Sequence, residues 1–322
     1  MGSRLCGGDW KDDAMTAGGP ARLGKVVVSG ASGLVGSAVR AALAEQSSTV
    51  VQLVRGKAEG LGQIAWNPAA EPAVAEPERL EGCAAALHFS GANLAGGRWT
   101  EAYKKTLRAS RVETTRALAR TLAALREPPK VLAVASAVGI YGNRGDEVLT
   151  ESSARGSGFL AELCAAWEAA AEPAVAAGMR VVHLRLGVVL SKNGGALKKM
   201  LPLFRLGLGG RIGSGRQWMS WISLDDAVRA ILFAVEKPEM TGAVNVVGPE
   251  PVTNAELTRV LARQLHRPAV LPAPAFALRL ALGPMADEAL LASTRAVPEK
   301  LEKAGFRFHH ARLAEALAAE LG

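Results

Sequence analysis

Residues 25–56 read KVVVSGASGLVGSAVRAALAEQSSTVVQLVRG, and the order of the patterns within them decides the fold. A run of β-branched residues leads into Gly30, Gly33 and Gly36, a helical pattern of apolar residues follows, and residues 50–54 return to mainly β-branched side chains. A strand, a glycine-rich turn, a helix and a second strand in this order are typical of a dinucleotide-binding unit. The glycine spacing is GxxGxxG rather than GxGxxG.

Each glycine has a physical task in such a unit. Gly30 permits the tight turn from strand to helix, Gly33 lets the backbone approach a pyrophosphate, and Gly36 lets the helix lie close to the sheet. The free N–H groups of the first helical turn then face the phosphates. A glycine-rich turn without a ligand is the alternative. We predict cofactor contacts from Gly30, Ser32, Gly33, Leu34, Val35 and Gly36.

The residue that follows the second strand indicates which dinucleotide binds. Sites for NAD usually place Asp or Glu there, about 20 residues beyond the glycines, to hold the ribose hydroxyls. This chain has Arg55 instead. A guanidinium can hold a 2′-phosphate through two parallel charge-assisted hydrogen bonds. We therefore predict NADP(H) in preference to NAD(H); the alternative is that Arg55 is a solvated surface residue.

Strand and helix patterns continue to alternate beyond this unit. Strands are predicted at 84–90, 131–136 and 181–189, and a helix at about 100–125. This alternation predicts an α/β protein with a Rossmann-type, doubly wound parallel sheet. Ligands of such sheets lie at the carboxyl ends of the strands. We assign further cofactor contacts to Ser90, Gly91, Ala92, Asn93 and Arg185.

The composition narrows the classes of partner. The chain has 322 residues, 49% of them hydrophobic, and a net charge of +8. This charge favours anionic partners, but Lys and Arg are not gathered in runs, so we expect cofactor phosphates rather than nucleic acid. No apolar run reaches the roughly 18 residues that cross a bilayer, and no membrane partner is expected.

The cysteines and histidines show no metal-binding spacing. The three cysteines lie far apart, and the five histidines form neither an HxxxH nor an HxH pattern. We therefore predict no metal site. Unpaired cysteines also suggest thiols that pack in a reducing compartment, which makes a cytoplasmic location the expectation.

The chain divides into three predicted segments. Residues 1–24 are expected to be a flexible N-terminal extension, because they carry three Asp and no apolar signal region; Met15 is an alternative start. Residues 25–250 are predicted to form the cofactor-binding domain. Residues 251–322 contain short helical patterns separated by prolines, and we expect a small helical subdomain that closes the far wall of the substrate cleft.

A second glycine-rich stretch, GLGGRIGSGRQW at 207–218, lies within a predicted substrate-side loop at 191–222. Its glycines supply backbone freedom, an arginine can hold an anion, and a tryptophan can cover a planar or apolar group. This composition favours a mobile, cationic lid over the substrate. A connection whose charges are merely solvated is the alternative. The predicted substrate-side residues are Arg216, Gln217 and Trp218.

Several stretches together resemble the extended short-chain dehydrogenase/reductase superfamily on its epimerase/dehydratase branch. They are SAVGIYG at 136–142, WEAAAE at 167–172, GSGRQWMSWISLDDAV at 213–228 and the tail from NVVGPEPVTNAEL onward. The match starts near residue 25 and is most similar to an epimerase-family subgroup with a C-terminal domain of unknown function, some members of which are described as cell-division inhibitor-like. The resemblance implies an NADP-type cofactor and an oxidoreductase or epimerase activity.

The resemblance also implies a homodimer, because broad-branch relatives often dimerise through the helices at 103–125 and 159–171 of this chain. One departure concerns position 223, where the subgroup usually has His and this chain has Ser223. A substrate contact made by that His in relatives would be lost or changed here.

The superfamily's catalytic Tyr-x-x-x-Lys pair is absent. In relatives the Tyr hydroxyl exchanges a proton with the substrate, and the Lys one helical turn later lowers the Tyr pKa. This chain has two tyrosines, Tyr103 and Tyr141, and neither is followed by Lys four residues later. Alignment on Glu168 puts Leu160 and Cys164 where the Tyr and Lys would stand.

Two residues near the crevice could take over the acid role, and they are Ser136 and Tyr141. The hypothesis is that Tyr141 supplies the acid together with Ser136, which lies at a strand end where the superfamily keeps a Ser. The alternative, slightly favoured, is that Tyr141 packs beneath the nicotinamide. The sequence thus supports an NADP(H)-dependent oxidoreductase or epimerase acting on a small anionic metabolite. A cofactor-binding sensor or regulator that has lost its chemistry is the second candidate.

Overall fold

A seven-stranded parallel sheet forms the centre of the protein. The computed structural model describes residues 23–322, and the sheet order is β11-β7-β5-β4-β1-β2-β3. All six strand pairs are parallel, and β1 lies between β4 and β2 with Val26 opposite Ala85 and Val50. The doubly wound fold class is therefore confirmed. The strands are β1 Lys25–Ser29, β2 Thr49–Val54, β3 Gln63–Ala65, β4 Ala85–His88, β5 Val131–Ala137, β7 Arg180–Leu186 and β11 Gly242–Val246.

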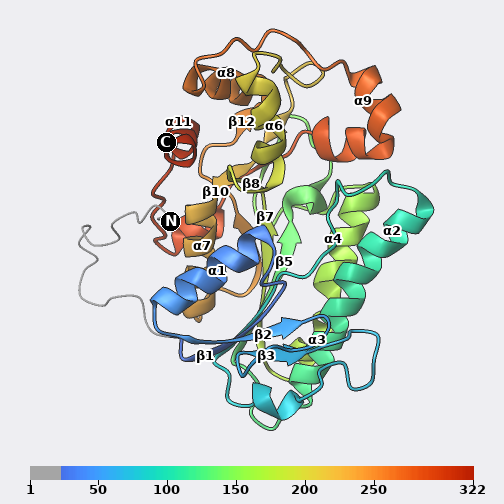
Figure 1. Cartoon of the computed structure of the whole chain (residues 1–322), viewed down its shortest axis with the longest axis vertical. Helices are drawn as coiled ribbons and strands as arrows, with labels where there is room; N and C mark the ends of the chain where they lie inside the picture. Colours follow the sequence, from blue (N-terminus) through green and yellow to red (C-terminus); the bar gives the residue numbers. More distant parts are fainter. Residues whose placement is uncertain (1–22) are drawn as a thin grey trace.

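Helices cover both faces of this sheet (Figure 1). One face is covered by α1 (Leu34–Glu45), α7 (Leu224–Glu236) and α10 (Glu299–Lys303), whose buried side chains share a core with the sheet. The other face carries α2 (Glu101–Arg108), η2 (Ala109–Glu113), α3 (Thr114–Ala123), α4 (Phe159–Ala169) and α5 (Glu172–Ala176). The helix predicted at about 100–125 is thus interrupted by the π-helical turn η2.

A second body, which we call the upper lobe, stands above the carboxyl ends of the strands (Figure 1). Its core joins Leu197 and Phe204 of α6 (Gly195–Arg205), Leu257 of α8 (Asn254–Gln264) and Leu317 of α11 (Leu313–Leu321). The lobe also contains β8 (Val188–Leu190), β9 (Trp218–Met219), β10 (Trp221–Ser223), β12 (Val252–Thr253) and α9 (Ala275–Leu282).

Shorter elements connect these bodies. The loops around the sheet carry the single turns η1 (Pro77–Leu80), η3 (Val138–Tyr141) and η4 (Ala286–Leu290), of which η4 is π-helical. A small parallel ladder joins β6 (Val148–Leu149) to β13 (Arg295–Ala296) and so ties the C-terminal part of the chain to the loop after β5.

The C-terminal part does not form one separate body. Residues 254–282 lie in the upper lobe, α10 returns to the sheet with Leu301 in its core, and α11 packs against α8 in the lobe again. The upper lobe is therefore built from C-terminal residues together with 188–223. The extension predicted for 1–24 lies almost entirely outside the described residues.

None of the helices between residues 23 and 322 is long and apolar enough to cross a membrane.

Candidate cofactor and substrate site

Steric contacts explain the glycines at the end of β1. Gly30 has a φ of 71°, and a Cβ there would lie 2.6 Å from the carbonyl carbon of Phe89. A Cβ on Gly36 would overlap the carbonyl oxygen of Gly30. These two glycines therefore let α1 and the end of β4 approach the turn.

Gly33 differs, because a Cβ there would make a contact without overlap. The nearest atom to a Cβ there would be 3.4 Å away, and the backbone of the loop is exposed at Ser32 and Gly33. Gly33 is also the N-cap residue of α1, and no side chain among residues 23–322 caps this helix. The first-turn N–H groups, at Leu34, Val35 and Gly36, are thus available to an anion.

Arg55 lies at the tip of β2, directly after Val54. The residue is exposed, and no carboxylate in the described part of the chain pairs with it. Because β2 is the neighbour of β1 in the sheet, its tip stands beside the glycine turn. A guanidinium in this position can reach the adenosine side of a dinucleotide held by that turn.

The segment Ser90–Asn93 follows β4, and hydrogen bonds from η2 hold it in place. Arg111 donates from Nη2 to the carbonyl oxygen of Ala92 over 2.9 Å, and the N–H of Ala92 donates to Oγ of Ser110 over 3.0 Å. The Tyr103 hydroxyl donates to the carbonyl oxygen of Asn93. The loop is thereby held at the carboxyl end of β4, next to the glycine turn.

Arg111 itself was missed by sequence reasoning. Its side chain is 8% exposed and lies 5.1 Å above the ring of Trp167, and burial lowers its pKa from the usual range. The arginine is positioned by the π-helical turn, and such a turn leaves no pattern in the sequence. No carboxylate within residues 23–322 pairs with it, so backbone carbonyls carry its hydrogen bonds.

Ser136 lies near the end of β5 and forms a hydrogen bond with Glu168 of α4. Its Oγ donates to Oε1 of Glu168 over 2.7 Å, while Arg185 donates to the same carboxylate from Nε over 2.8 Å and from Nη2 over 2.9 Å. Burial opposes the charge of Arg185, but the hydrogen bonds and ion pairing with Glu168 outweigh burial and raise its pKa. Arg185, assigned to the cofactor by the sequence, is held mainly by these protein groups.

Tyr141 is fully buried in η3. Its hydroxyl donates to Oδ1 of Asn245 over 2.7 Å and accepts from Nη1 of Arg185 over 3.0 Å. Burial raises the pKa of Tyr141, although the neighbouring Arg185 partly offsets this. Both hydrogen-bonding capacities of the hydroxyl are thus used within the protein, which favours the packing role over the acid role.

Leu160 and Cys164 occupy the face of α4 that packs against η3. Both approach Gly139, where an added Cβ would lie 3.5 Å from Cβ of Leu160 and 3.9 Å from Sγ of Cys164. Burial, and next the charge of Glu168, raise the pKa of Cys164 to about 12, so the thiol stays protonated at neutral pH. Leu160 and Cys164 are therefore packing residues of α4.

The predicted substrate-side stretch is fastened to the C-terminal part of the chain. Gly213 donates its N–H to the carbonyl oxygen of Ala273, and Ala273 donates to that of Arg211, each over 2.9 Å. Gln217 is 7% exposed, and its Nε2 donates to the carbonyl oxygens of Ile212 and Leu290 over 3.1 Å. These bonds favour a segment that is held in place by the C-terminal part of the chain over a mobile lid.

The other two predicted substrate-side residues have different surroundings. The Trp218 indole donates to Oδ1 of Asp146 over 2.7 Å, and the guanidinium of Arg295 lies 4.1 Å from its ring. Arg216 is exposed, and its backbone N–H donates to Oγ of Ser214. Arg216 is thus the residue of the three whose side chain is directed to solvent.

His88, at the end of β4, is a buried residue that the sequence did not single out. Its Nδ1 lies 2.5 Å from Oγ of Ser29, and its Nε2 lies 3.3 Å from Oγ1 of Thr114. Burial lowers the pKa of His88 to about 3, so the ring is neutral at physiological pH. It joins β1, β4 and α3 beneath the glycine turn.

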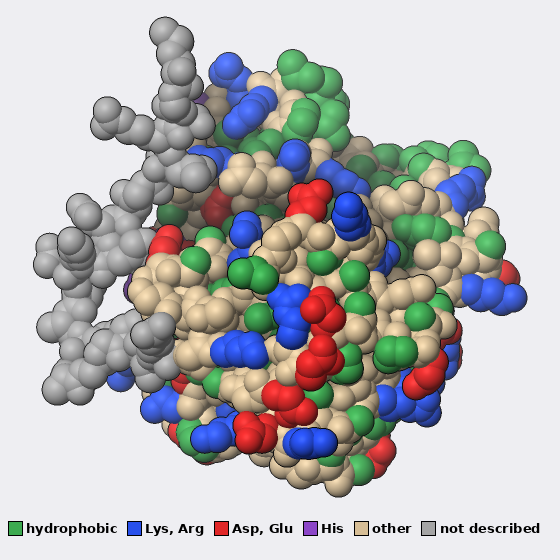
Figure 2. Space-filling view, turned by 60° about the horizontal axis from the view of Figure 1, so that its bottom comes forward, with side chains coloured by type: hydrophobic (Ala, Val, Ile, Leu, Met, Phe, Trp, Pro, Cys, Tyr) green, Lys and Arg blue, Asp and Glu red, His purple; other side chains and the backbone are tan. Residues whose placement is uncertain are grey.

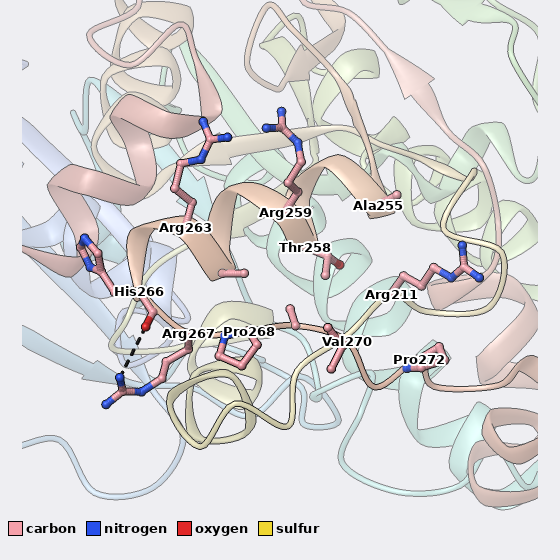
Figure 3. A pocket seen from close by; sticks show the side chains of 12 residues that line it. Arg211, Ala255, Thr258, Arg259, Arg263, His266, Arg267, Pro268, Val270 and Pro272 are labelled. Atoms are coloured by element: carbon pink, nitrogen blue, oxygen red, sulfur yellow. Dashed lines mark hydrogen bonds between the residues drawn. The ribbon is translucent and has the colours of Figure 1, made fainter.

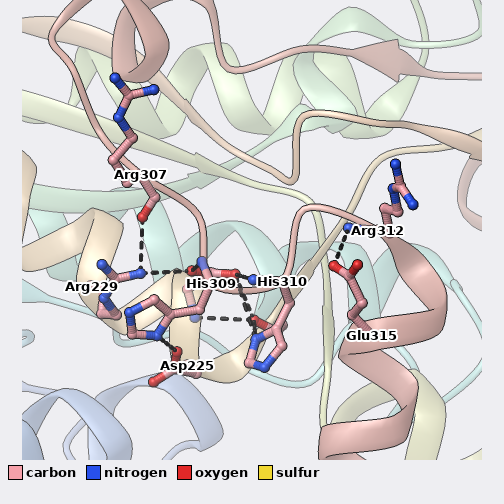
Figure 4. A network of polar contacts seen from close by, with 9 residues as sticks. Asp225, Arg229, Arg307, His309, His310, Arg312 and Glu315 are labelled. Atoms are coloured by element: carbon pink, nitrogen blue, oxygen red, sulfur yellow. Dashed lines mark hydrogen bonds and ion pairs between the residues drawn. The ribbon is translucent and has the colours of Figure 1, made fainter. Parts of the chain in front are cut away.

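An imidazole also stands beside Ser223, supplied by the C-terminal part of the chain (Figure 4). Nδ1 of His310 lies 3.2 Å from Oγ of Ser223, which caps α7 by accepting from the N–H of Asp226. The histidine expected at position 223 in relatives is thus absent from β10, but a different histidine contacts that position.

Asp225, Asp226 and His309 are the described residues that come nearest to a metal-binding group. One ligand atom of each lies within 4.8 Å of the others. The carboxylate of Asp226, however, already accepts from Arg229 over 3.0 Å and from the N–H groups of His309 and His310 over 2.8 and 2.9 Å (Figure 4). Because these hydrogen bonds occupy the carboxylate, a structural contact between α7 and the C-terminal segment is favoured over an ion site.

The chain matches the pattern of the NAD dependent epimerase/dehydratase family over residues 26–262, and that of a domain of unknown function, DUF1731, over residues 273–320. It is 48% identical to the epimerase family protein Mb2239 of Mycobacterium bovis over 292 residues, which cover 91% of this chain and 96% of that protein. It is 33% identical to the human epimerase family protein SDR39U1 over 296 residues, which cover 91% of this chain and 98% of that protein.

Two solved structures are similar. The human SDR39U1 structure with NADPH superposes with a TM-score of 0.83 at 31% identity, covering 92% of this chain and 98% of that chain. A nucleoside-diphosphate sugar epimerase from Corynebacterium glutamicum gives a TM-score of 0.75 at 37% identity, covering 92% of this chain and 58% of that chain. Since the family pattern spans most of the chain and relatives align over nearly all of the described part, the protein belongs to the NAD dependent epimerase/dehydratase family.

Proposed function

We propose that the protein is an NADP(H)-dependent oxidoreductase or epimerase of the extended short-chain type that acts on a small anionic metabolite. The observation that carries the proposal is the start of α1, which no side chain of residues 23–322 caps, above a sterically constrained glycine turn. Arg55 is exposed beside this turn and has no carboxylate partner among the same residues. The human relative was solved with NADPH, which supports the same cofactor here.

The residues present fit a phosphorylated dinucleotide. The turn at 30–36 would hold the pyrophosphate through backbone N–H groups, Arg55 the 2′-phosphate, and Ser90–Asn93 the ribose and nicotinamide side. When bound, the cofactor supplies hydride transfer at the nicotinamide. Ser136 is then the candidate to contact the substrate oxygen, because Glu168 fixes its hydroxyl at the end of β5. Tyr141 remains a candidate acid only if it gives up its bonds to Asn245 and Arg185.

The charge of α6 and of the loop at 207–218 supports an anionic substrate. Lys198, Lys199 and Arg216 are exposed, and none pairs with a carboxylate in the described chain. Cations that are not neutralised attract anions. The Corynebacterium relative is described as acting on nucleoside-diphosphate sugars, so sugar nucleotides belong among the first anionic compounds to test.

A catalytically silent NADP(H)-binding sensor, for example in cell division, is the second candidate function. The specific observation in its favour is that the usual Tyr and Lys positions hold Leu160 and a protonated Cys164 that both pack against η3. A turnover screen with NADPH and pooled carbonyl metabolites distinguishes the two.

A homodimer through α2–α3 and α4, and a cytoplasmic location suggested by free thiols at Cys83 and Cys164, complete the proposal.

The first test is a titration with NADPH and with NADH, followed by tryptophan fluorescence or calorimetry. We expect NADPH to bind about tenfold or more tightly than NADH, and Arg55→Ala to remove this difference by weakening NADPH alone, because a charge-assisted pair with the 2′-phosphate is worth about 1.5–3 kcal/mol. Arg40→Ala, an exposed arginine farther along α1, is the control. If neither nucleotide binds, the enzyme and sensor proposals both fail.

A further inference from the structure

The positive charge of the molecule is concentrated in the upper lobe. Residues 188–223 and 254–283, which form most of this lobe, contain ten Lys and Arg against one acidic residue, a net charge of +9, whereas the whole chain carries +8. Figure 2 shows basic side chains on both the upper and the lower part of the visible face, whereas most of the acidic ones lie on the lower part. The lobe is therefore the part of the protein that attracts an anionic partner.

A groove of about 630 Å³ runs along α8 in this lobe (Figure 3). One wall is the face of α8 from Ala255 to Arg263, about 12 Å long at the rise of an α-helix, continued by His266 beyond the end of the helix. The other wall is the segment at 267–272. The small side chains of Ala255, Ala262 and Ala269 leave room along the groove, which lies outside the site that holds the glycine turn and Arg55.

The arginines around the groove do not converge on one point. In Figure 3, Arg259 and Arg263 extend to the same side of α8, whereas Arg211 and Arg267 stand at opposite ends of the groove. Arg259 pairs with Glu256, but the other three have no carboxylate partner within residues 23–322. Guanidinium groups spread over this length suit separate carboxylates on an extended ligand better than a compact phosphate.

Exposed apolar side chains and one unpaired hydroxyl lie beside these arginines in the described chain. Val270 is 73% exposed, Leu271 51% and Leu206 71%. The N–H of Leu271 donates to the carbonyl oxygen of Gly209, so the segments carrying these side chains lie together at the rim. In the wall itself, Oγ1 of Thr258 is buried without a hydrogen-bond partner in the described chain. A buried hydroxyl left unpaired is costly, and a polar group of an occupant could pair with it.

We propose that this groove docks an acidic, amphipathic segment of a partner protein. The carboxylates of the segment bind Arg211, Arg263 and Arg267, and its apolar side chains cover Val270 and the neighbouring leucines. Arginine is enriched in protein–protein interfaces, and a groove beside one helix is a common way to bind an amphipathic segment. The proposal does not depend on the reaction at the cofactor site.

The test selects ligands from random 16-residue peptides displayed on phage, with the NADPH-loaded full-length protein as the target. We expect the enriched peptides to be acidic and to carry Leu, Ile or Val at helical or alternating spacing. The best peptide, made synthetically with a fluorescent label, is then titrated against the wild type and against the double variant Arg211→Glu/Arg263→Glu. Reversal of two charges that contact carboxylates should weaken binding by at least about tenfold.

Arg40→Glu/Arg126→Glu is the matched control, because both arginines are exposed outside the groove and outside the helices proposed for the dimer, and the change in net charge is the same. The control should stay within about twofold of the wild type. The proposal fails if no acidic peptide is enriched, or if the two double variants weaken binding equally. It also fails if 20-nucleotide single-stranded DNA, or vesicles of phosphatidylcholine with phosphatidylglycerol, bind the groove more tightly than the peptide, or if a second copy of the chain occupies it in sedimentation experiments.

Discussion

Glu168 is the residue on which the polar groups at the carboxyl end of β5 depend. It accepts from Ser136 and binds Arg185, and Arg185 in turn donates to the hydroxyl of Tyr141. Removal of either member of a buried ion pair leaves the other charge uncompensated, which costs about 3–5 kcal/mol. The network therefore fixes the orientation of Ser136 at the end of β5, and Tyr141 contributes to this from a position that no solvent reaches.

Tyr141→Phe should lower the free energy of unfolding by about 1–3 kcal/mol, because Oδ1 of Asn245 loses its donor and Arg185 one acceptor. NADPH affinity should be unchanged. Urea denaturation and a nucleotide titration measure the two effects, and Tyr103→Phe, at a hydroxyl that is less buried, serves as the comparison. A variant that is fully stable but loses all turnover would contradict the packing role and restore the acid role.

His88 gives a pH dependence of stability. Its folded pKa is lowered to about 3, whereas its ordinary value is 6.5. Between these values the unfolded chain binds a proton that the folded chain does not, so the free energy of unfolding falls as the pH drops below about 6.5. The fall from this residue approaches about 1.4 kcal/mol per pH unit. His88→Gln should reduce the slope of stability against pH by one proton in this window. Urea titrations between about pH 4 and 6.5 test this, and equal slopes for both proteins would refute it.

At the scale of elements, the unit from β1 to β2 combines steric constraints on its glycines with exposed N–H groups. A Cβ on Gly30 or Gly36 would overlap the backbone of Phe89 or of Gly30, whereas a Cβ on Gly33 would come no closer than 3.4 Å to another atom. A single short segment thus provides both the close packing of α1 on the sheet and the exposed N–H groups at its start.

Gly36→Ala should separate α1 from the turn, because its Cβ would overlap the carbonyl oxygen of Gly30. We expect a loss of about 1–3 kcal/mol in stability, typical of overpacking, together with weaker NADPH binding. Gly62→Ala is the control, since its Cβ would meet its nearest atom at 3.8 Å with no unusual φ. Thermal unfolding and nucleotide titration of both variants measure the effects; equal behaviour would mean that the turn adapts.

Elements fixed by local patterns could be predicted from the sequence. The strands at β1, β2 and β5 begin and end within about one residue of their predicted bounds, because β-branched runs and glycines act on their own segments. The π turn η2 could not be predicted, because the contact of its Arg111 is with Ala92, 19 residues earlier in a different loop. A mobile loop was predicted at 207–218. Its hydrogen bonds to Ala273 and Leu290 could not be predicted, because these residues lie far along the chain.

In the candidate site, too, features set by neighbouring residues could be predicted and features set by distant residues could not. The glycine turn and Arg55 are recognisable because their roles follow from neighbours in sequence. The sequence left an acid role for Tyr141 open because Asn245, whose Oδ1 accepts the hydrogen bond of its hydroxyl, lies 104 residues away. Likewise, Gln217 could not be recognised as a structural residue before Leu290 was found beside it.

At the scale of the whole molecule, the sheet and the upper lobe share the C-terminal part of the chain. Leu301 of α10 belongs to the core on one face of the sheet, and Leu317 of α11 belongs to the core of the lobe. The two bodies are therefore coupled through one continuous segment, in addition to the β6–β13 ladder.

Leu301→Ala and Leu317→Ala should each lower stability by about 2–5 kcal/mol, the range for truncating a buried leucine. Because one segment joins the two cores, both variants should shift a single calorimetric transition to lower temperature. Leu61→Ala, at a leucine that is 93% exposed, should shift it little. Two separate transitions, each moved by only one of the core variants, would show that the sheet and the lobe unfold independently.

The return of α10 to the sheet has a consequence for how the protein is made. The strand β11 leaves the ribosome before Leu301, yet Leu301 completes the core between this strand and α7. The lobe likewise lacks Leu313 and Leu317 until α11 has emerged. A nascent chain that pauses near residue 290 thus exposes two incomplete cores at once, and exposed apolar surface of this kind is what chaperones bind during synthesis.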